Sequence, residues 1–93
     1  MNKLENYRSC GQIPANPTAK LIYLALSDAA NHGNYVIIPQ RRIAEALGIS
    51  RTAVSANLRR LERAGAITIE SLYNQYGGRL PNKYRLEGKK NDG

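Results

Sequence analysis

The 93-residue sequence contains no Trp and no Phe, and it has a single Cys and a single His. Because one Cys cannot form a disulfide within the chain, the composition is typical of a reducing compartment. Cys10 and His32 lie in separate turn-rich stretches, and nothing near either residue predicts an activated nucleophile. The sequence also lacks zinc-ligand spacing and a glycine-rich phosphate loop. We therefore expect no enzymatic activity, no metal, no cofactor and no small-molecule ligand.

Long apolar runs are also absent. No segment approaches the roughly 20 apolar residues that span a bilayer, and residues 1–8 (MNKLENYR) lack the apolar core of a signal peptide. A basic amphipathic helix could lie on a membrane surface, but the apolar face available here is narrow and is needed for the core. We expect a cytoplasmic protein that does not engage membranes.

Positive charge is in excess and is unevenly distributed. Fourteen Lys and Arg residues against seven Asp and Glu residues give a formal net charge of +7. Residues 41–63 hold six arginines and two glutamates, which gives +4, against +1 for residues 1–40 and +2 for residues 64–93. Such an excess favours nucleic acid, anionic membrane or acidic protein as the partner. Arginine is also the side chain that forks onto phosphate or guanine.

The first part of the chain predicts a helix and a short strand. Asn16 is a good cap for the helix, and Pro17 is tolerated at its first position. Gly33, after the helix, is expected to adopt a left-handed conformation. A β-rich run follows at Tyr35–Ile38 and ends before Pro39. The apolar face of the helix is predicted to consist of Leu21, Ile22, Ala25, Leu26 and Ala29.

Two further helices are predicted over 40–47 and from Ser50 to about Ala64. Gly48 and Gly65 are expected to end them, and Ser50 is expected to cap the second. Two short helices joined by a glycine-containing turn form a helix-turn-helix. Their shared core is predicted to consist of Leu47, Ile49, Val54, Leu58 and Leu61, with the small Ala44 where the two helices approach closely.

A hairpin is predicted directly after these helices, with a strand over 66–73, a turn region over 74–82 and a short return strand over 83–86. The expected fold is therefore mainly α with a small β-hairpin, a winged helix-turn-helix in the order helix, strand, helix, helix, strand, strand. The chain divides into three predicted parts, namely an N-terminal arm (1–15), the winged domain (16–87) and a flexible tail (88–93).

The predicted third helix has two chemically different faces. At about 100° per residue, Val54, Leu58 and Leu61 share the inward face. The opposite face carries Thr52, Ala56, Arg59 and Arg63, flanked by Ser55 and Arg60. An ordinary solvated helix usually mixes charges of both signs, whereas short side chains and arginines suit close approach to the major groove.

The hairpin offers a second contact. Its tip region is glycine-rich and cationic, which suits contact with phosphates or entry into the minor groove. The alternative is an ordinary solvated hairpin whose Tyr73 and Tyr84 merely pack across the strands. The predicted DNA-binding residues are Arg41, Arg42, Ser50, Arg51, Thr52, Ser55, Ala56, Arg59, Arg60, Arg63, Arg79 and Lys83.

These motifs resemble known families. The segment IAEALGISRTAVSANLRRLERAGAI is similar to MarR- and GntR-type winged helix-turn-helix modules. The longer segment IPQRRIAEALGISRTAVSANLRRLERAGAI, together with NPTAKLIYLAL and GRLPNKYRL, resembles more closely the N-terminal module of plasmid and phage replication proteins of the DnaD and replication-initiator kind, over roughly residues 12–87. The resemblance implies DNA contacts at Arg51, Thr52, Ser55, Ala56, Arg59 and Arg79.

Asn57 departs from the pattern of these families, which usually place a small apolar residue at its position. Two interpretations are open. Either its side chain bonds to backbone or water, or its polarity rotates the outward face of the helix.

The sequence thus predicts a protein that binds double-stranded DNA in a sequence-specific manner. It would be either a transcriptional regulator or the DNA-binding module of a replication or mobile-element protein. The alternative is a winged-helix interaction module that docks an acidic partner protein. A single winged helix has a small footprint on DNA, so we expect a homodimer. The N-terminal arm, with Leu4, Tyr7 and Ile13, or the first helix would form the contact.

Overall fold

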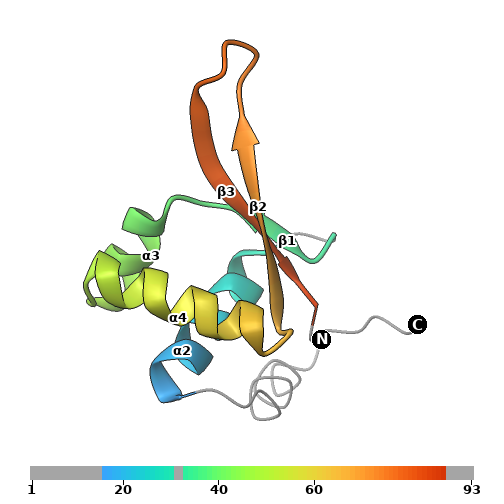
Figure 1. Cartoon of the computed structure of the whole chain (residues 1–93). Coiled ribbons are helices and arrows are strands. Elements are labelled where there is room, and N and C mark those ends of the chain that lie inside the picture. The colour runs from blue at the N-terminus through green and yellow to red at the C-terminus, as the bar shows by residue number, and fades with distance from the viewer. Residues whose placement is uncertain (1–15, 31–32, 88–93) are drawn as a thin grey trace.

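A computed structural model of the chain describes residues 16–30 and 33–87 (Figure 1). Cys10, His32, the predicted arm over 1–15 and the predicted tail over 88–93 lie outside these residues. The element order is helix, strand, helix, helix, strand, strand, which confirms the winged helix-turn-helix prediction. The elements are α2 (Pro17–Ala29), β1 (Tyr35–Ile37), α3 (Gln40–Leu47), α4 (Arg51–Arg63), β2 (Ile67–Tyr73) and β3 (Arg79–Leu86).

The helices begin and end at the residues whose local chemistry predicts it. The Asn16 side chain accepts a hydrogen bond of 2.8 Å from the Ala19 N–H at the start of α2. The Ser50 hydroxyl accepts one of 3.0 Å from the Ala53 N–H at the start of α4. Gly48 follows α3 with φ of +68°, a left-handed conformation that a Cβ would penalise. The predicted caps and the glycine stop are therefore confirmed.

The prediction for Gly33 is wrong, because the left-handed residue of this turn is Asn34, with φ of +59°. Asn is among the few residues other than Gly that adopt this conformation readily. Gly33 is needed for a different reason. A Cβ at this position would lie 2.7 Å from Cε2 of the Tyr35 ring, so the glycine lets the backbone lie directly against the ring.

The buried face of α2 differs from the predicted one. Leu21 is 45% exposed and Ala29 is exposed, whereas Ala19 and Tyr23 are fully buried. With Ile22 and Leu26, these residues follow an i, i+3, i+4, i+7 spacing, which is the stripe that a helix buries. The aromatic ring of Tyr23 rather than Leu21 therefore fills the space beneath the sheet and α4.

The three strands form one antiparallel sheet in the order β1-β3-β2. Tyr84, at the centre of β3, lies opposite Ile69 of β2 and Val36 of β1. One face of the sheet packs on the helices, and Tyr84 is fully buried there. The core unites both layers and consists of Ala19, Ile22, Tyr23, Leu26, Ile43, Ala44, Val54, Leu58, Leu61, Ala66, Ile67, Tyr84 and Leu86.

Strand β3 begins earlier than predicted, because residues 79–82 belong to the strand and only residues 74–78 form the turn. The predicted turn region was too long because Pro81 and Asn82 are typical turn residues. In the structure the pairing shifts between Glu70–Lys83 and Leu72–Leu80, which leaves one extra residue in β3. Such a bulge tolerates the missing N–H of proline and bends the strand.

Asn57 is buried within α4, and its side chain bonds to the backbone. Its Nδ2 group donates a hydrogen bond of 2.8 Å to the Ala53 carbonyl, one turn earlier. Its Oδ1 atom is buried and has no hydrogen-bond partner among the described residues. Backbone bonding, one of the two interpretations of this residue, is thereby confirmed, and one polar atom of α4 stays unsatisfied in the core.

Replacing Asn57 with Ala is expected to raise the free energy of unfolding by about 1 kcal/mol, because it removes a buried unsatisfied acceptor and improves helix propensity. Urea unfolding followed by circular dichroism measures the change. Leu58→Ala serves as the control, since loss of a buried leucine should cost about 2–5 kcal/mol. A clear destabilisation by Asn57→Ala would show that the Oδ1 atom is satisfied in solution.

Candidate nucleic-acid interface

The face of α4 that points away from the core carries the predicted contact residues. Val54, Leu58 and Leu61 are buried on the inward side, as predicted from the spacing. Ser55 is half-buried at the edge. The exposed residues of the outward side are Arg51, Thr52, Ala56, Arg59, Arg60, Glu62 and Arg63.

The turn before α4 fixes the direction in which this helix projects. Only residues 48–50 separate α3 from α4, and the Ile49 N–H donates a 3.1 Å hydrogen bond back to the Ala44 carbonyl. Ala44 itself is buried where the two helices meet. Because the side chains of Thr52 and Ala56 are short, the first turns of α4 can bring their backbone close to a flat or grooved surface.

The arginines of α3 and α4 are not neutralised within the fold. None of the six forms an ion pair or a hydrogen bond through its side chain with residues 16–30 or 33–87. Unpaired guanidinium groups keep their full attraction for a polyanion, since no internal carboxylate competes for them. The six are Arg41, Arg42, Arg51, Arg59, Arg60 and Arg63.

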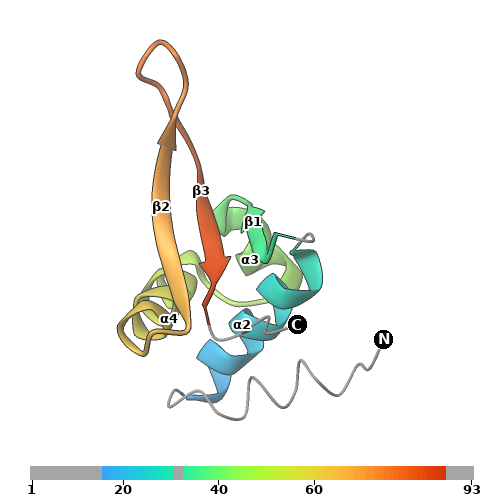
Figure 2. The ribbon, with the colours of Figure 1, turned by 90° about the vertical axis from the view of Figure 1, so that its right-hand side faces the viewer.

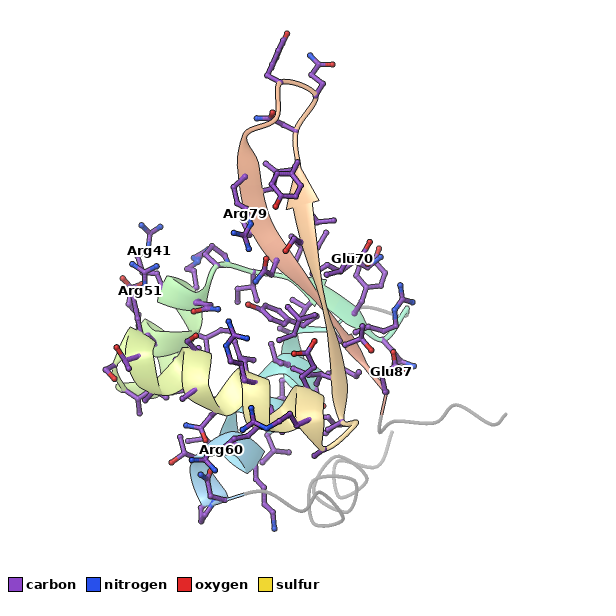
Figure 3. The ribbon with its side chains drawn as sticks, viewed as in Figure 1. Arg41, Arg51, Arg60, Glu70, Arg79 and Glu87 are labelled. Atoms are coloured by element: carbon purple, nitrogen blue, oxygen red, sulfur yellow. The ribbon has the colours of Figure 1, made fainter. Side chains whose placement is uncertain are left out.

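The labelled arginines lie apart from the two labelled glutamates (Figure 3). In Figure 3, Arg41 and Arg51 point away from the body beside the start of α4, and Arg79 extends from β3 toward the same side. Arg60 points instead toward α2, and Glu70 and Glu87 lie on the opposite side of the hairpin. In this view Arg41, Arg51 and Arg79 lie on one side of the fold, and Arg60 lies apart from them.

The hairpin continues the surface that α4 begins. In Figure 2, α4 and the hairpin of β2 and β3 lie on one side of the molecule, whereas α2 and β1 lie on the other. The hairpin also projects far beyond the helices in both views. One elongated partner can therefore contact α4 and the hairpin at the same time.

Arg79 is held in place by its neighbours. Its Nη2 group donates hydrogen bonds to Asn82 Oδ1 at 2.9 Å and to Ser71 Oγ at 3.4 Å. The guanidinium carbon lies 5.9 Å from the centre of the Tyr73 ring. Asn82 in turn donates a 3.5 Å hydrogen bond from Nδ2 to the hydroxyl of the buried Tyr84. Through Asn82, hydrogen bonds thus connect Arg79 to a residue of the core. Arg79 is the first residue of β3 and is not part of the loop at the tip.

Replacing Asn82 with Ala is expected to weaken DNA binding about fivefold, because Arg79 would lose the acceptor that orients it. The same change in an Arg79→Ala background should have no further effect, since the orienting bond then has nothing to orient. Fluorescence anisotropy with labelled duplex measures both variants. Equal losses in the two backgrounds would mean that Asn82 acts independently of Arg79.

Lys83 lies on the other face of the sheet. Its Nζ atom is 4.4 Å from the centre of the Tyr35 ring, and its partners across the strands are Glu70 and Ile37. The structure therefore does not bring this predicted contact residue together with Arg79.

Hydrogen bonds to the side chain of Asn74 order the loop at the hairpin tip. The Asn74 side chain accepts hydrogen bonds from the N–H groups of Tyr76 at 2.8 Å and Gly78 at 2.9 Å. The Asn74 and Asn82 side chains were not among the predicted site residues. An Asn shortly before a Gly pair is a recognisable turn signal, which could have indicated Asn74. Asn82 could not be found in this way, because its contact with Arg79 depends on the bulge in β3.

The described helices include none that is long and apolar enough to cross a membrane. Within the described ranges, no group of three His, Cys, Asp or Glu side chains is placed to hold a metal ion. A family model with the description "Helix-turn-helix domain" matches residues 16–67, which span α2, β1, α3, α4 and the start of β2. No curated protein matches the chain.

Proposed function

The protein belongs to the helix-turn-helix domain family, whose model covers more than half of its length, and we propose that it binds double-stranded DNA in a sequence-specific manner. The domain itself indicates DNA binding, because this arrangement of two helices presents the second one to the major groove. The observation that carries the finer proposal is the outward face of α4, where short side chains alternate with arginines that have no partner within the described fold.

In this proposal α4 lies in the major groove. Thr52, Ser55 and Ala56 allow the first turns of the helix to approach the base edges. Arg59, about two turns from the helix start, is long enough to fork onto the O6 and N7 atoms of a guanine. Sequence is read by such base contacts, while contacts to phosphate set the position of the helix.

Phosphate contacts come from cations around the edge of α4. Arg51 and Arg63 stand at the two ends of the helix, and Arg41 and Arg42 at the start of α3 are exposed beside it. Arg79 on the hairpin extends the same contact along the backbone of the duplex. Of these residues, Arg41, Arg51 and Arg79 are labelled in Figure 3, and they lie on one side of the fold.

We further propose that the protein acts in the cytoplasm by binding alone, without a catalytic step or cofactor. Its role would be that of a transcriptional regulator or of the DNA-binding module of a replication or mobile-element protein. The support for these roles is the resemblance of residues 16–26, 38–67 and 78–86 to such modules. Two copies would enlarge the small footprint of one winged helix and raise its selectivity.

Selection of bound sites from a pool of random duplexes, followed by sequencing, tests this function. A defined enriched motif is expected, and a motif with two half-sites about one helical turn apart would indicate two bound copies. If low-salt titration detects no binding to any duplex, the proposal is wrong. Binding to an acidic protein under the same conditions would then favour an interaction module.

A further inference from the structure

The tip of the hairpin differs chemically from its sides. Residues 74–78 (Asn-Gln-Tyr-Gly-Gly) carry no charge, and the cations of the hairpin, Arg79, Lys83 and Arg85, all lie on β3. A loop that added to the electrostatic attraction for phosphates would present Lys or Arg. The tip instead presents amides and a phenol, which form hydrogen bonds without adding charge, and the phenol ring also offers a flat surface that can stack on a base.

Tyr76 is the most exposed large side chain of this region. It is 86% exposed, against 59% for Tyr73 lower on the hairpin. No described residue forms a side-chain hydrogen bond or ring contact with Tyr76, so the ring has no polar or stacking partner within the described fold. A tyrosine ring offers both a flat surface that stacks on any base and a hydroxyl that forms hydrogen bonds.

The loop holds this ring on a defined backbone. The Asn74 N–H and the Gly78 carbonyl are joined by a 2.8 Å hydrogen bond, and the Gly77 N–H donates one of 3.0 Å to the Asn74 carbonyl. Gly77 adopts φ of +85°, which the reversal of the chain requires. With the two bonds to the Asn74 side chain, the loop is ordered before it binds, which lowers the entropic cost of a contact at its tip.

The hairpin extends toward a neighbouring groove of a bound duplex. Residues 71–73 continue β2 for about 10 Å beyond Glu70, the last paired β2 residue before the bulge, and the turn at residues 74–78 carries Tyr76 farther out. The centres of adjacent major and minor grooves are about 17 Å apart along the helix axis, half of a turn of about 34 Å. Because α4 and the hairpin lie on the same side (Figure 2), a duplex with α4 in its major groove would present its adjacent minor groove on the side toward which the hairpin tip extends.

We infer that Tyr76 is a base-contacting residue whose ring enters this minor groove and partly unstacks one base step. The inference rests on the proposed DNA binding and deepens it. Apolar and aromatic wedges of this kind kink the duplex at the step they enter. The preferred steps are the easily unstacked pyrimidine–purine ones, so Tyr76 adds sequence preference outside the segment that α4 contacts.

The test uses the full chain and the duplex obtained by selection, with 2-aminopurine placed at successive steps of the flanking minor groove. Wild-type protein should raise the fluorescence at one step, as unstacking does, and Tyr76→Ala should abolish the rise. Tyr76→Ala should also weaken binding about 5- to 20-fold, with no change in the dependence of affinity on salt, because the removed ring carries no charge. Tyr76→Phe should keep both the rise and most of the affinity.

Three other results would overturn the inference. Tyr76→Ala could bind as tightly as wild type with the same fluorescence rise, which would leave the tip solvated in the complex. An equal loss of affinity in Tyr76→Phe and Tyr76→Ala would indicate that only the hydroxyl contacts the duplex, as a hydrogen bond to a phosphate would. Loss of affinity without any fluorescence rise in wild type would mean that no step is unstacked. If wild type binds no duplex at all, the proposed function itself fails, which separates the two failures.

Discussion

Raising the salt concentration from about 50 mM to about 200 mM is expected to weaken binding to duplex DNA by about 500-fold. The estimate assumes that about five phosphates are neutralised, which gives a slope of about −4.5 in a plot of log affinity against log salt. The physical basis is the set of arginines on α3 and α4 that no carboxylate of the described fold pairs with. Titrations by fluorescence anisotropy at four or five salt concentrations measure the slope.

Two matched variants locate the charges responsible. Arg51→Gln removes a cation beside the start of α4 and should reduce the slope by about one unit. Lys83→Gln removes one charge as well, but from the opposite face of the sheet, where Lys83 lies over the Tyr35 ring, so it should leave the slope unchanged. A slope near zero in wild type would contradict an electrostatic DNA interface. If Arg51→Gln and Lys83→Gln reduced the slope equally, Lys83 would also contact the DNA.

Replacing Arg59 with Ala is expected to cost about 1–3 kcal/mol of binding to the preferred site, which is about a 5- to 150-fold loss, and much less on scrambled duplex. The reason is that a guanine contact discriminates between sequences. Arg79→Ala provides the comparison, because a phosphate contact should weaken binding to both duplexes about equally and reduce the salt slope by about one unit.

Titration of both variants against the preferred and the scrambled duplex at two salt concentrations separates these roles. If Arg59→Ala lowers the affinity for both duplexes by the same factor, Arg59 contacts phosphates and not a base. Base reading would then rest on Arg51, Thr52 and Ser55, the remaining polar residues in the first turns of α4.

Local chemistry made the helix-turn-helix predictable. Gly48 and Ser50 mark the ends of α3 and α4 through their own backbone and side-chain preferences, and the apolar spacing in α4 determines which side is buried. The outward positions of the predicted contact residues follow directly from that spacing. Features of this kind depend on a few neighbours in sequence, and the structure agrees with them.

Features that depend on the pairing of distant residues were not predictable. Arg79 and Lys83 are four residues apart, so the plain alternation of a strand would place both on one face. The extra residue at Pro81 and Asn82 reverses the alternation between them and puts them on opposite faces. The Asn82–Arg79 contact has the same origin. For α2, the choice between Leu21 and Tyr23 was decided by the shape of the sheet and α4 above it.

The division of α4 into two faces also has an evolutionary consequence. Its inward residues determine whether the domain folds, and its outward residues contribute almost nothing to the core. Substitutions at Thr52, Ala56 or Arg59 are therefore nearly neutral for folding, as exposed positions usually are. Under the proposed function, descendants of such a chain can acquire new DNA targets one substitution at a time without passing through unfolded intermediates.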